Sequence, residues 1–418
     1  MIKNIFFPKD KTVFEKLLFL FFSIYPITFL IGNFAINLIV LIIFIIFFNT
    51  IIFNKFNSFK SNKYLIYLLS FLFISLLINL YFSNNFYLTY PRVLKFILII
   101  SFVLAFKQLL KSYNYDEINT LYKIWSIVFL IVIIDLIFEL VFKSNILGFK
   151  AIIPGRLTSF TGKEMIIGHF FSAFSLIILS YIYLNFKNKN LSLLIALSFI
   201  ILSFLIGERS NFIKTFIILS VFILFTYEIK LKLKFFIVSL IVLIFVSLLN
   251  FNNNYKVRYF DQLDKIFNKN GINNYLEHSI YGAHYKVAQE IFKDNPVFGV
   301  GIKNFRVESF SKKYDDLKHK HRNRRGNTHP HQIHYELLSE TGLFGYFSFM
   351  IFIFISLYFF YKSFKKHKNI YQFSGMLFVV VNLLPLLPSG SFFSTYSAGL
   401  FWINYSIMMG YIGNETKF

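Results

Sequence analysis

Long runs of apolar residues alternate with short polar segments along most of the chain. A run of about 18 or more apolar residues is long enough to cross the hydrocarbon core of a bilayer as a helix. Twelve runs meet or approach that length, near residues 14–32, 35–53, 64–82, 92–106, 123–142, 165–185, 191–206, 212–228, 235–250, 341–361, 371–388 and 392–412. The pattern predicts an all-α polytopic membrane protein with about 12 transmembrane helices.

The alternation stops at one long polar segment, which separates the ninth predicted span from the tenth. Within it, apolar residues recur at helical spacing in SIYGAHYKVAQEIFKDNP, which predicts an amphipathic helix that ends at Asp294-Asn295-Pro296. We therefore divide the chain into spans 1–9 over residues 1–250, a large loop with short helices over 251–340, and spans 10–12 over 341–418.

Composition agrees with a membrane protein and indicates which classes of partner the protein binds. Of the 418 residues, 56% are hydrophobic, whereas soluble domains contain about 45–50% apolar residues. The formal net charge of +23 favours membrane lipids or an anionic substrate over nucleic acid. The chain has no cysteine, which excludes disulfides, thiolate metal sites and thiol catalysis.

The distribution of lysine predicts how the spans are oriented. Lysines gather in the short connections 54–63, 107–122, 186–190, 229–234 and 362–370, whereas the intervening short loops are nearly free of them. Because positively charged short loops stay in the cytoplasm, we expect a multi-pass protein of the bacterial inner membrane with both termini in the cytoplasm. The long loop then faces the periplasm; long loops translocate regardless of their charge.

The arginines are distributed differently from the lysines. All eight fall on the outer face in this topology: Arg92, Arg156, Arg209, Arg258, Arg306, Arg322, Arg324 and Arg325. A guanidinium group binds phosphate through two parallel hydrogen bonds, which an ammonium group does not. This predicts that a phosphorylated substrate binds at the outer face of the membrane. The alternatives are chance and ordinary ion pairs, among them a pair between Glu208 and Arg209.

Histidines concentrate just before the tenth span, in the segment THPHQIHYELLSETGLFG. A helix start near Thr328 and Pro330 would place His331 at the outer membrane boundary, on one helix face with His334. A neutral imidazole is a natural general base for a sugar hydroxyl. The alternative is a metal site that combines His329 and His331 with another loop histidine, His319 or His321, although no acidic or cysteine ligand accompanies them.

Several segments, in their order and spacing, resemble the O-antigen ligase and polymerase family of bacterial membrane glycosyltransferases. They are GRLTSFTGKEMIIGHF, GERSNF, IFKDNPVFGVGIKNF, THPHQIHYELLSETGLFG and PLLPSGSFF. Members of that family are helical membrane proteins with about this number of spans and one large periplasmic loop, so the resemblance covers most of the chain.

The resemblance implies glycan transfer at the periplasmic face. The donor would be a saccharide on undecaprenyl pyrophosphate. The acceptor would be lipid A-core in a ligase, or another lipid-linked repeat unit in a polymerase. We expect no metal and no other cofactor, because the activated donor carries the energy, and direct attack would invert the anomeric centre.

The resemblance also assigns roles to residues. The catalytic candidates are His331, His329 and Arg209; the family's histidine is usually followed by Asn, where this chain has Gln332. At the start of the periplasmic helix, Tyr281 and Tyr285 replace an arginine and a tryptophan of many members. Arg258 or His284 would then contact the pyrophosphate, although His284 also suits a structural role. The expected substrate contacts are Arg156, Arg258, Arg92, His284, Gly299, Gly301, Asn304 and Glu340.

Two other classes of protein remain open. A flippase or transporter for the same lipid-linked glycan would also have many spans and outer cations, but transporters typically show repeats, broken helices and charges at mid-membrane. Asp135 and Glu139, one turn apart in the fifth predicted span, are the only such feature. A non-catalytic membrane anchor would leave the arginine distribution unexplained.

Overall fold

The fold is known from a computed structural model, which describes residues 11–53, 63–228, 253–260 and 271–413 with isolated positions between 229 and 252. Over these residues the protein is all-α, which confirms the predicted fold class. The helices that follow predicted spans are α2 (Val13–Ile31), α3 (Asn33–Phe53), α5 (Lys63–Tyr81), α6 (Phe86–Ser112), α7 (Tyr115–Phe142), α8 (Ile167–Asn185), α9 (Lys189–Leu205), α10 (Arg209–Thr226), α17 (Ile333–His367), α18 (Ile370–Val381) and α19 (Thr395–Gly410).

Within the described residues, eight helices are long and apolar enough to cross a membrane, namely α2, α3, α5, α6, α7, α8, α10 and α17. Helices α9 and α18 are shorter and apolar, and α19 has 16 residues. The ninth predicted span, 235–250, lies outside the described residues apart from isolated positions, as do most of the connections 54–63 and 229–234. A polytopic membrane protein is therefore confirmed, whereas the count of twelve spans is not.

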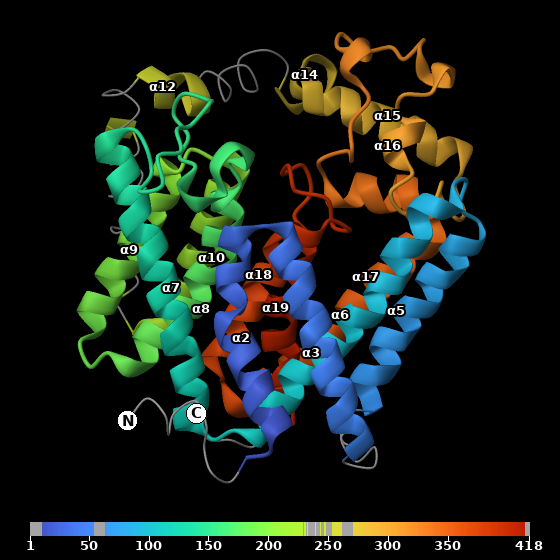
Figure 1. Ribbon diagram of the computed structural model, residues 1–418. Helices are drawn as coiled ribbons and strands as arrows, with labels where there is room; N and C mark the ends of the chain where they lie inside the picture. Colours follow the sequence, from blue (N-terminus) through green and yellow to red (C-terminus); the bar gives the residue numbers. More distant parts are fainter. Residues whose placement is uncertain are drawn as a thin grey trace.

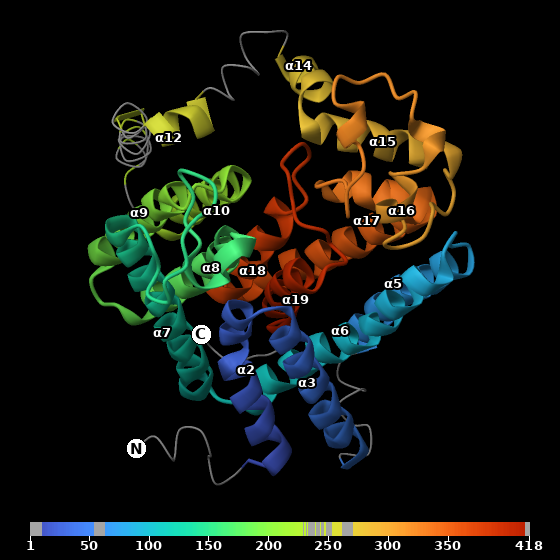
Figure 2. The same cartoon turned by 45° about the horizontal axis from the view of Figure 1, so that its top comes forward.

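Helices α18 and α19 lie in the middle of the bundle. Figure 2 shows α7, α8, α9 and α10 on one side of them and α5, α6 and α17 on the other. Every residue of α19 from Leu400 to Gly410 is buried. The bundle therefore consists of two flanks joined by a buried centre.

The short helices of the long loop gather at one end of the bundle, at the top of Figure 1. They are α12 (Asn253–Tyr255), η2 (Lys256–Phe260), α14 (Gly271–His278), α15 (Ile280–Asp294), α16 (Phe305–Glu308), η3 (Lys312–Tyr314) and η4 (Arg322–Arg324). Helix α15 is the predicted amphipathic helix: Ser279 caps its start, and it buries Ala283, Val287, Ala288 and Ile291. Ile280, which was expected on the buried stripe, is instead 40% exposed.

A break in α17 fixes the loop to the bundle. Gly342 departs from helical geometry with φ 63° and ψ −169°, and the segment 296–301 fills the break. Leu343 N–H donates to the Pro296 carbonyl at 2.8 Å, and Gly301 N–H donates to the Glu340 carbonyl at 2.8 Å. Backbone groups that the break frees are thereby paired, as buried backbone requires.

The first glycine of GVG, Gly299, allows this close approach. A Cβ atom at Gly299 would lie 2.5 Å from the Glu340 carbonyl carbon, and Gly299 itself has φ +67°. Asn79 of α5 completes the junction, since its amide donates to the Phe298 carbonyl at 2.8 Å and the Glu340 carbonyl at 2.9 Å. In this structure the glycine turn therefore meets the backbone of α17.

The start of α17 differs from the prediction. Its first residue is Ile333, and the side chain of Gln332 caps it by accepting hydrogen bonds from the N–H groups of His334 and Tyr335. His331 precedes the cap in a left-handed conformation, with φ 59°. The predicted start near Thr328 and Pro330 is therefore wrong, and His331 does not share a helix face with His334.

Candidate active site

Two carboxylates of α7 hold the loop that carries Arg156. Asp135 accepts a hydrogen bond from the Ser159 hydroxyl at 2.6 Å, and Glu139 accepts from the N–H groups of Thr158 and Ser159 at 2.8–3.0 Å. Both carboxylates are buried. They therefore anchor the loop, which accounts for the one feature of the sequence that suggested a transporter.

The anchored loop lies against the turn between α9 and α10. Leu157 N–H donates to the Ile206 carbonyl at 3.0 Å. A Cβ atom at Gly207 would lie 1.9 Å from the Gly155 carbonyl oxygen, so only glycine permits this contact. The contact brings Arg156 beside Glu208.

Glu208 pairs with Arg156 and not with Arg209, the partner that the alternative interpretation of the sequence gave it. The two side chains are 3.4 Å apart, measured from Nη2 of Arg156 to Oε1 of Glu208. The Glu208 carboxylate also accepts from Gly168 N–H at 2.8 Å and from the Asn211 amide at 2.5 Å. These partners draw its side chain toward the start of α8 and away from Arg209.

Arg209 and Arg258 complete an arginine cluster with Arg156. Nη1 of Arg209 donates to the Arg258 carbonyl at 3.2 Å, and Nε of Arg258 donates to the Gly207 carbonyl at 2.9 Å. Burial, together with the nearby charges of Arg209 and Arg156, lowers the pKa of Arg258 to about 10. Among the described residues this cluster combines three guanidinium groups with one carboxylate, Glu208, so it has an excess of positive charge that suits an anion.

A histidine cluster forms at the start of α17. The ring centroids of His329 and His331 are 4.1 Å apart, and those of His284 and His331 are 5.6 Å apart. Asn327 lies among them, with Nδ2 at 3.1 Å from Nε2 of His331 and 3.3 Å from Nε2 of His284. The ring of Tyr281 lies 5.4 Å from that of His331, and the same tyrosine is close enough to Arg209 to interact electrostatically.

The histidines of this cluster are neutral at physiological pH. Burial, together with the neighbouring His329 and His284, lowers the pKa of His331 to about 3. Burial likewise lowers the pKa of His329 to about 4, with a further contribution from the positive charge of Lys303. The pKa of His284 is also lowered by burial. A neutral imidazole has a lone pair that can accept a proton.

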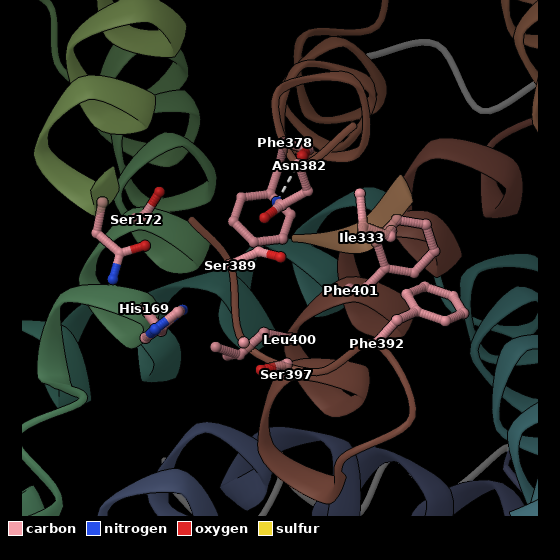
Figure 3. A pocket seen from close by; sticks show the side chains of 12 residues that line it. His169, Ser172, Ile333, Phe378, Asn382, Ser389, Phe392, Ser397, Leu400 and Phe401 are labelled. Atoms are coloured by element: carbon pink, nitrogen blue, oxygen red, sulfur yellow. Dashed lines mark hydrogen bonds between the residues drawn. The ribbon is translucent and has the colours of Figure 1, made fainter. Parts of the chain in front are cut away.

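A pocket lies beside His169 of α8, and none of the clustered arginines or histidines is among its lining residues. It is lined by His169, Ser172, Asn211, Ile333, Phe378, Asn382, Ser389, Gly390, Phe392, Ser397, Leu400 and Phe401. In Figure 3, His169 of α8 faces Ser389 and Ser397 across this space. His169 is close enough to both Arg156 and His329 to interact electrostatically, which links the pocket to the arginine cluster and to the histidine cluster.

A buried ion pair fixes the loop between α18 and α19 beside the histidines. Nζ of Lys303 is 3.9 Å from Oε1 of Glu336, and both side chains are buried. The Glu336 carboxylate accepts from Phe392 N–H at 2.8 Å. Ser389 N–H, in the same loop, donates to the His331 carbonyl at 2.8 Å. The ion pair therefore helps to hold the backbone of His331.

The remaining predicted contacts form a third group beside α6 and α17. Arg92 is half-buried and has Arg306 and Glu340 as electrostatic neighbours. The Asn304 amide donates to the Thr89 hydroxyl at 2.8 Å, and Glu340 is fully buried next to the glycine turn. The structure thus brings Arg156, Arg209 and Arg258 into one cluster and His284, His329 and His331 into another, with these residues in a separate group.

The histidines proposed for a metal site are not assembled as one. The imidazoles of His319 and His321 lie 2.9 and 3.0 Å from the carbonyls of Leu276 and His278. Among the described residues, no group of three or more His, Cys, Asp or Glu side chains could hold a metal ion.

The sequence alone did not identify several residues of the site, including His169, Asn211, Lys303, Asn327, Glu336 and Asn382. Some of them lie within or beside the segments that carried the resemblance: His169 belongs to GRLTSFTGKEMIIGHF, and Asn211 belongs to GERSNF. Motif membership was therefore an available signal for these two. The same signal was available for Lys303 in IFKDNPVFGVGIKNF and for Glu336 in THPHQIHYELLSETGLFG, whereas Asn327 and Asn382 lie outside the segments.

Comparison with known proteins identifies the central part of the chain. Residues 191–350 match the family described as O-antigen ligase. No curated protein matches the chain significantly. The matched range runs from α9 through the long loop into α17 and includes Arg209, Arg258 and all three clustered histidines, whereas Arg92 and Arg156 lie before it. The family resemblance seen in the motifs is confirmed over residues 191–350, where the chain is similar to the O-antigen ligase family.

Proposed function

We propose that this protein is an O-antigen ligase, which transfers a glycan from an undecaprenyl-pyrophosphate-linked donor to lipid A-core at the periplasmic face of the bacterial inner membrane. The observation that carries the proposal is the arrangement of the two clusters. Neutral histidines form one cluster and guanidinium groups with excess positive charge form the other, and His169, which lines the pocket, is an electrostatic neighbour of both Arg156 and His329. The family match supports glycan transfer of the ligase or polymerase type.

The arginine cluster would bind the pyrophosphate of the donor. Arg209 and Arg156 supply guanidinium groups that stabilise the negative charge that develops as the pyrophosphate leaves. A preorganised donor of this kind typically contributes about 3–4 kcal/mol to lowering a barrier. Arg258 adds a third cation to the cluster. It would replace the arginine that many members of the family carry at the position of Tyr281.

The histidine cluster would activate the acceptor. The acceptor hydroxyl oxygen attacks the anomeric carbon and forms the new glycosidic bond, while the bond from that carbon to the pyrophosphate oxygen breaks. Nε2 of His331 takes the hydroxyl proton, and the pyrophosphate leaves with the bonding electrons. Attack opposite the leaving group inverts the anomeric centre. No step in this sequence requires a metal ion.

The placement of the loop supports the proposed orientation. The short helices of the loop lie at one end of the bundle, whereas the connections from α6 to α7 and from α8 to α9 lie at the other (Figure 1). Those two connections carry lysines that favour the cytoplasm. The clusters would then face the periplasm, where lipid A-core and the lipid-linked donor are both accessible.

A polymerase that joins lipid-linked repeat units is the second candidate, because it would use the same donor and the same chemistry. Purified protein in liposomes distinguishes the candidates. With lipid-linked oligosaccharide and lipid A-core present, a ligase forms glycosylated lipid A-core, whereas a polymerase lengthens the lipid-linked chain. If neither product forms and labelled donor crosses the bilayer instead, the protein is a transporter and the proposal is wrong.

A further inference from the structure

The side chain of Asn327 contacts two histidines of the candidate site, and the sequence motifs assign it no role. Resting on the proposed function, we infer that Asn327 is a positioning residue that keeps Nε2 of His331 free of a proton, so that this atom receives the proton of the acceptor hydroxyl. The argument depends on which atom of each side chain can donate a hydrogen bond.

The orientation of the Asn327 amide follows from its own segment. Oδ1 lies 2.7 Å from the backbone nitrogen of Thr328, and a backbone N–H can only donate. Oδ1 is therefore the acceptor in that contact, and Nδ2 is the atom that faces the histidines. The amide has two N–H bonds to offer, one for each imidazole.

His284 accepts one of these hydrogen bonds. Its Nδ1 lies 2.9 Å from the Arg325 carbonyl oxygen, which can only accept, so Nδ1 carries the proton. Its Nε2 then has a lone pair toward Asn327 Nδ2, at 3.3 Å. Arg325 is itself held by Asp315 at 2.6 Å, so the carbonyl that sets the tautomer of His284 is fixed in place.

His331 accepts the other hydrogen bond. Its Nε2 lies 3.1 Å from Nδ2 of Asn327, and the neutral imidazole must then carry its proton on Nδ1. When the acceptor hydroxyl bonds this lone pair, it displaces only the hydrogen bond between Asn327 and His331, because the Asn327 amide stays bonded to His284. The other titratable groups that face His331 are His329, from its own segment, and His284 and Tyr281, both from α15.

Asn327→Asp tests this assignment with the least change of shape. The aspartate keeps an oxygen for Thr328 N–H but replaces the amide donor with a second acceptor, so it favours a proton on Nε2 of His331. Asn323→Asp is the matched control, because Asn323 is an exposed residue in the same loop and the substitution adds the same charge.

The protonation state is read by ¹⁵N NMR of histidine-labelled protein, with the His331 signal identified by its loss in His331→Ala. We expect the wild-type His331 to be neutral with its proton on Nδ1, and Asn327→Asp to place a proton on Nε2 at pH 7. The kcat of transfer should then fall about 10-fold or more, whereas the KM for the donor should stay as in the wild type. The acidic limb of the pH profile should move to higher pH, because a carboxylate favours the charged imidazole. Asn323→Asp should match the wild type.

A wild-type His331 with its proton on Nε2 overturns the inference, whether or not Asn327→Asp folds. A wild-type tautomer and pH profile in Asn327→Asp overturn it as well. If His331→Ala keeps full transfer activity, the proposed base is wrong, while the NMR result still decides whether Asn327 sets the tautomer.

Discussion

At the scale of single residues, the shape of the guanidinium group of Arg209 should matter as much as its charge. Arg209→Lys keeps the charge but loses the planar pair of donors that fits a phosphate. We expect transfer to fall about 10-fold or more while the amount of folded protein is retained. Arg322→Lys, an exposed position in the same long loop, is the control. Wild-type transfer by Arg209→Lys would mean that Arg209 is only a structural charge.

The residue types of the site could be predicted from the sequence, but the partners of several could not. Arg209, Arg258 and Arg156 were selected because arginine suits phosphate, and the structure brings them together. A pair of Glu208 with its sequence neighbour Arg209 was one alternative, but Glu208 bonds Gly168 and Asn211 and pairs with Arg156. Such choices depend on segments far apart in the chain, which residue spacing does not specify.

At the scale of elements, the break in α17 makes a prediction about stability. Gly342→Ala would force a side chain into a backbone conformation, φ 63° and ψ −169°, that is essentially restricted to glycine, at a cost of about 1–3 kcal/mol, and its Cβ would lie 2.4 Å from the Val297 carbonyl oxygen. Gly148→Ala is the matched control, because Gly148 has φ +83° and no atom within 4 Å of its Cβ position. Thermal melting in detergent should fall further for Gly342→Ala; equal melting temperatures would show that the junction does not need glycine.

The helices were predicted well where apolar runs are long, and poorly where polar side chains set the ends. Helix α6 was expected from residue 92, where the apolar run begins, but it starts at Phe86 because Asn85 caps it. Helix α17 was expected near Thr328, but Gln332 caps it at Ile333. In both cases a side chain that bonds the first turn fixes the boundary, and hydropathy does not detect it.

At the scale of the whole molecule, the orientation across the membrane is the claim that decides where the site works. Alkaline phosphatase is active only outside the cytoplasm, so a fusion after Asn270 in the long loop should be active and a fusion after Lys366 should not. The Lys-rich connections predict this orientation. The reverse pattern of activity would place the histidine cluster in the cytoplasm and remove it from a periplasmic acceptor.

The central claim is that His331 is the general base of a glycan transfer, and single-turnover transfer by purified protein tests it most directly. His331→Ala should bind the lipid-linked donor normally yet transfer it about 10²–10⁴-fold more slowly. His329→Ala should have a smaller effect, and EDTA should change neither wild type nor variant. An active His331→Ala beside an inactive His329→Ala would contradict the account, as would activity that EDTA abolishes and zinc restores.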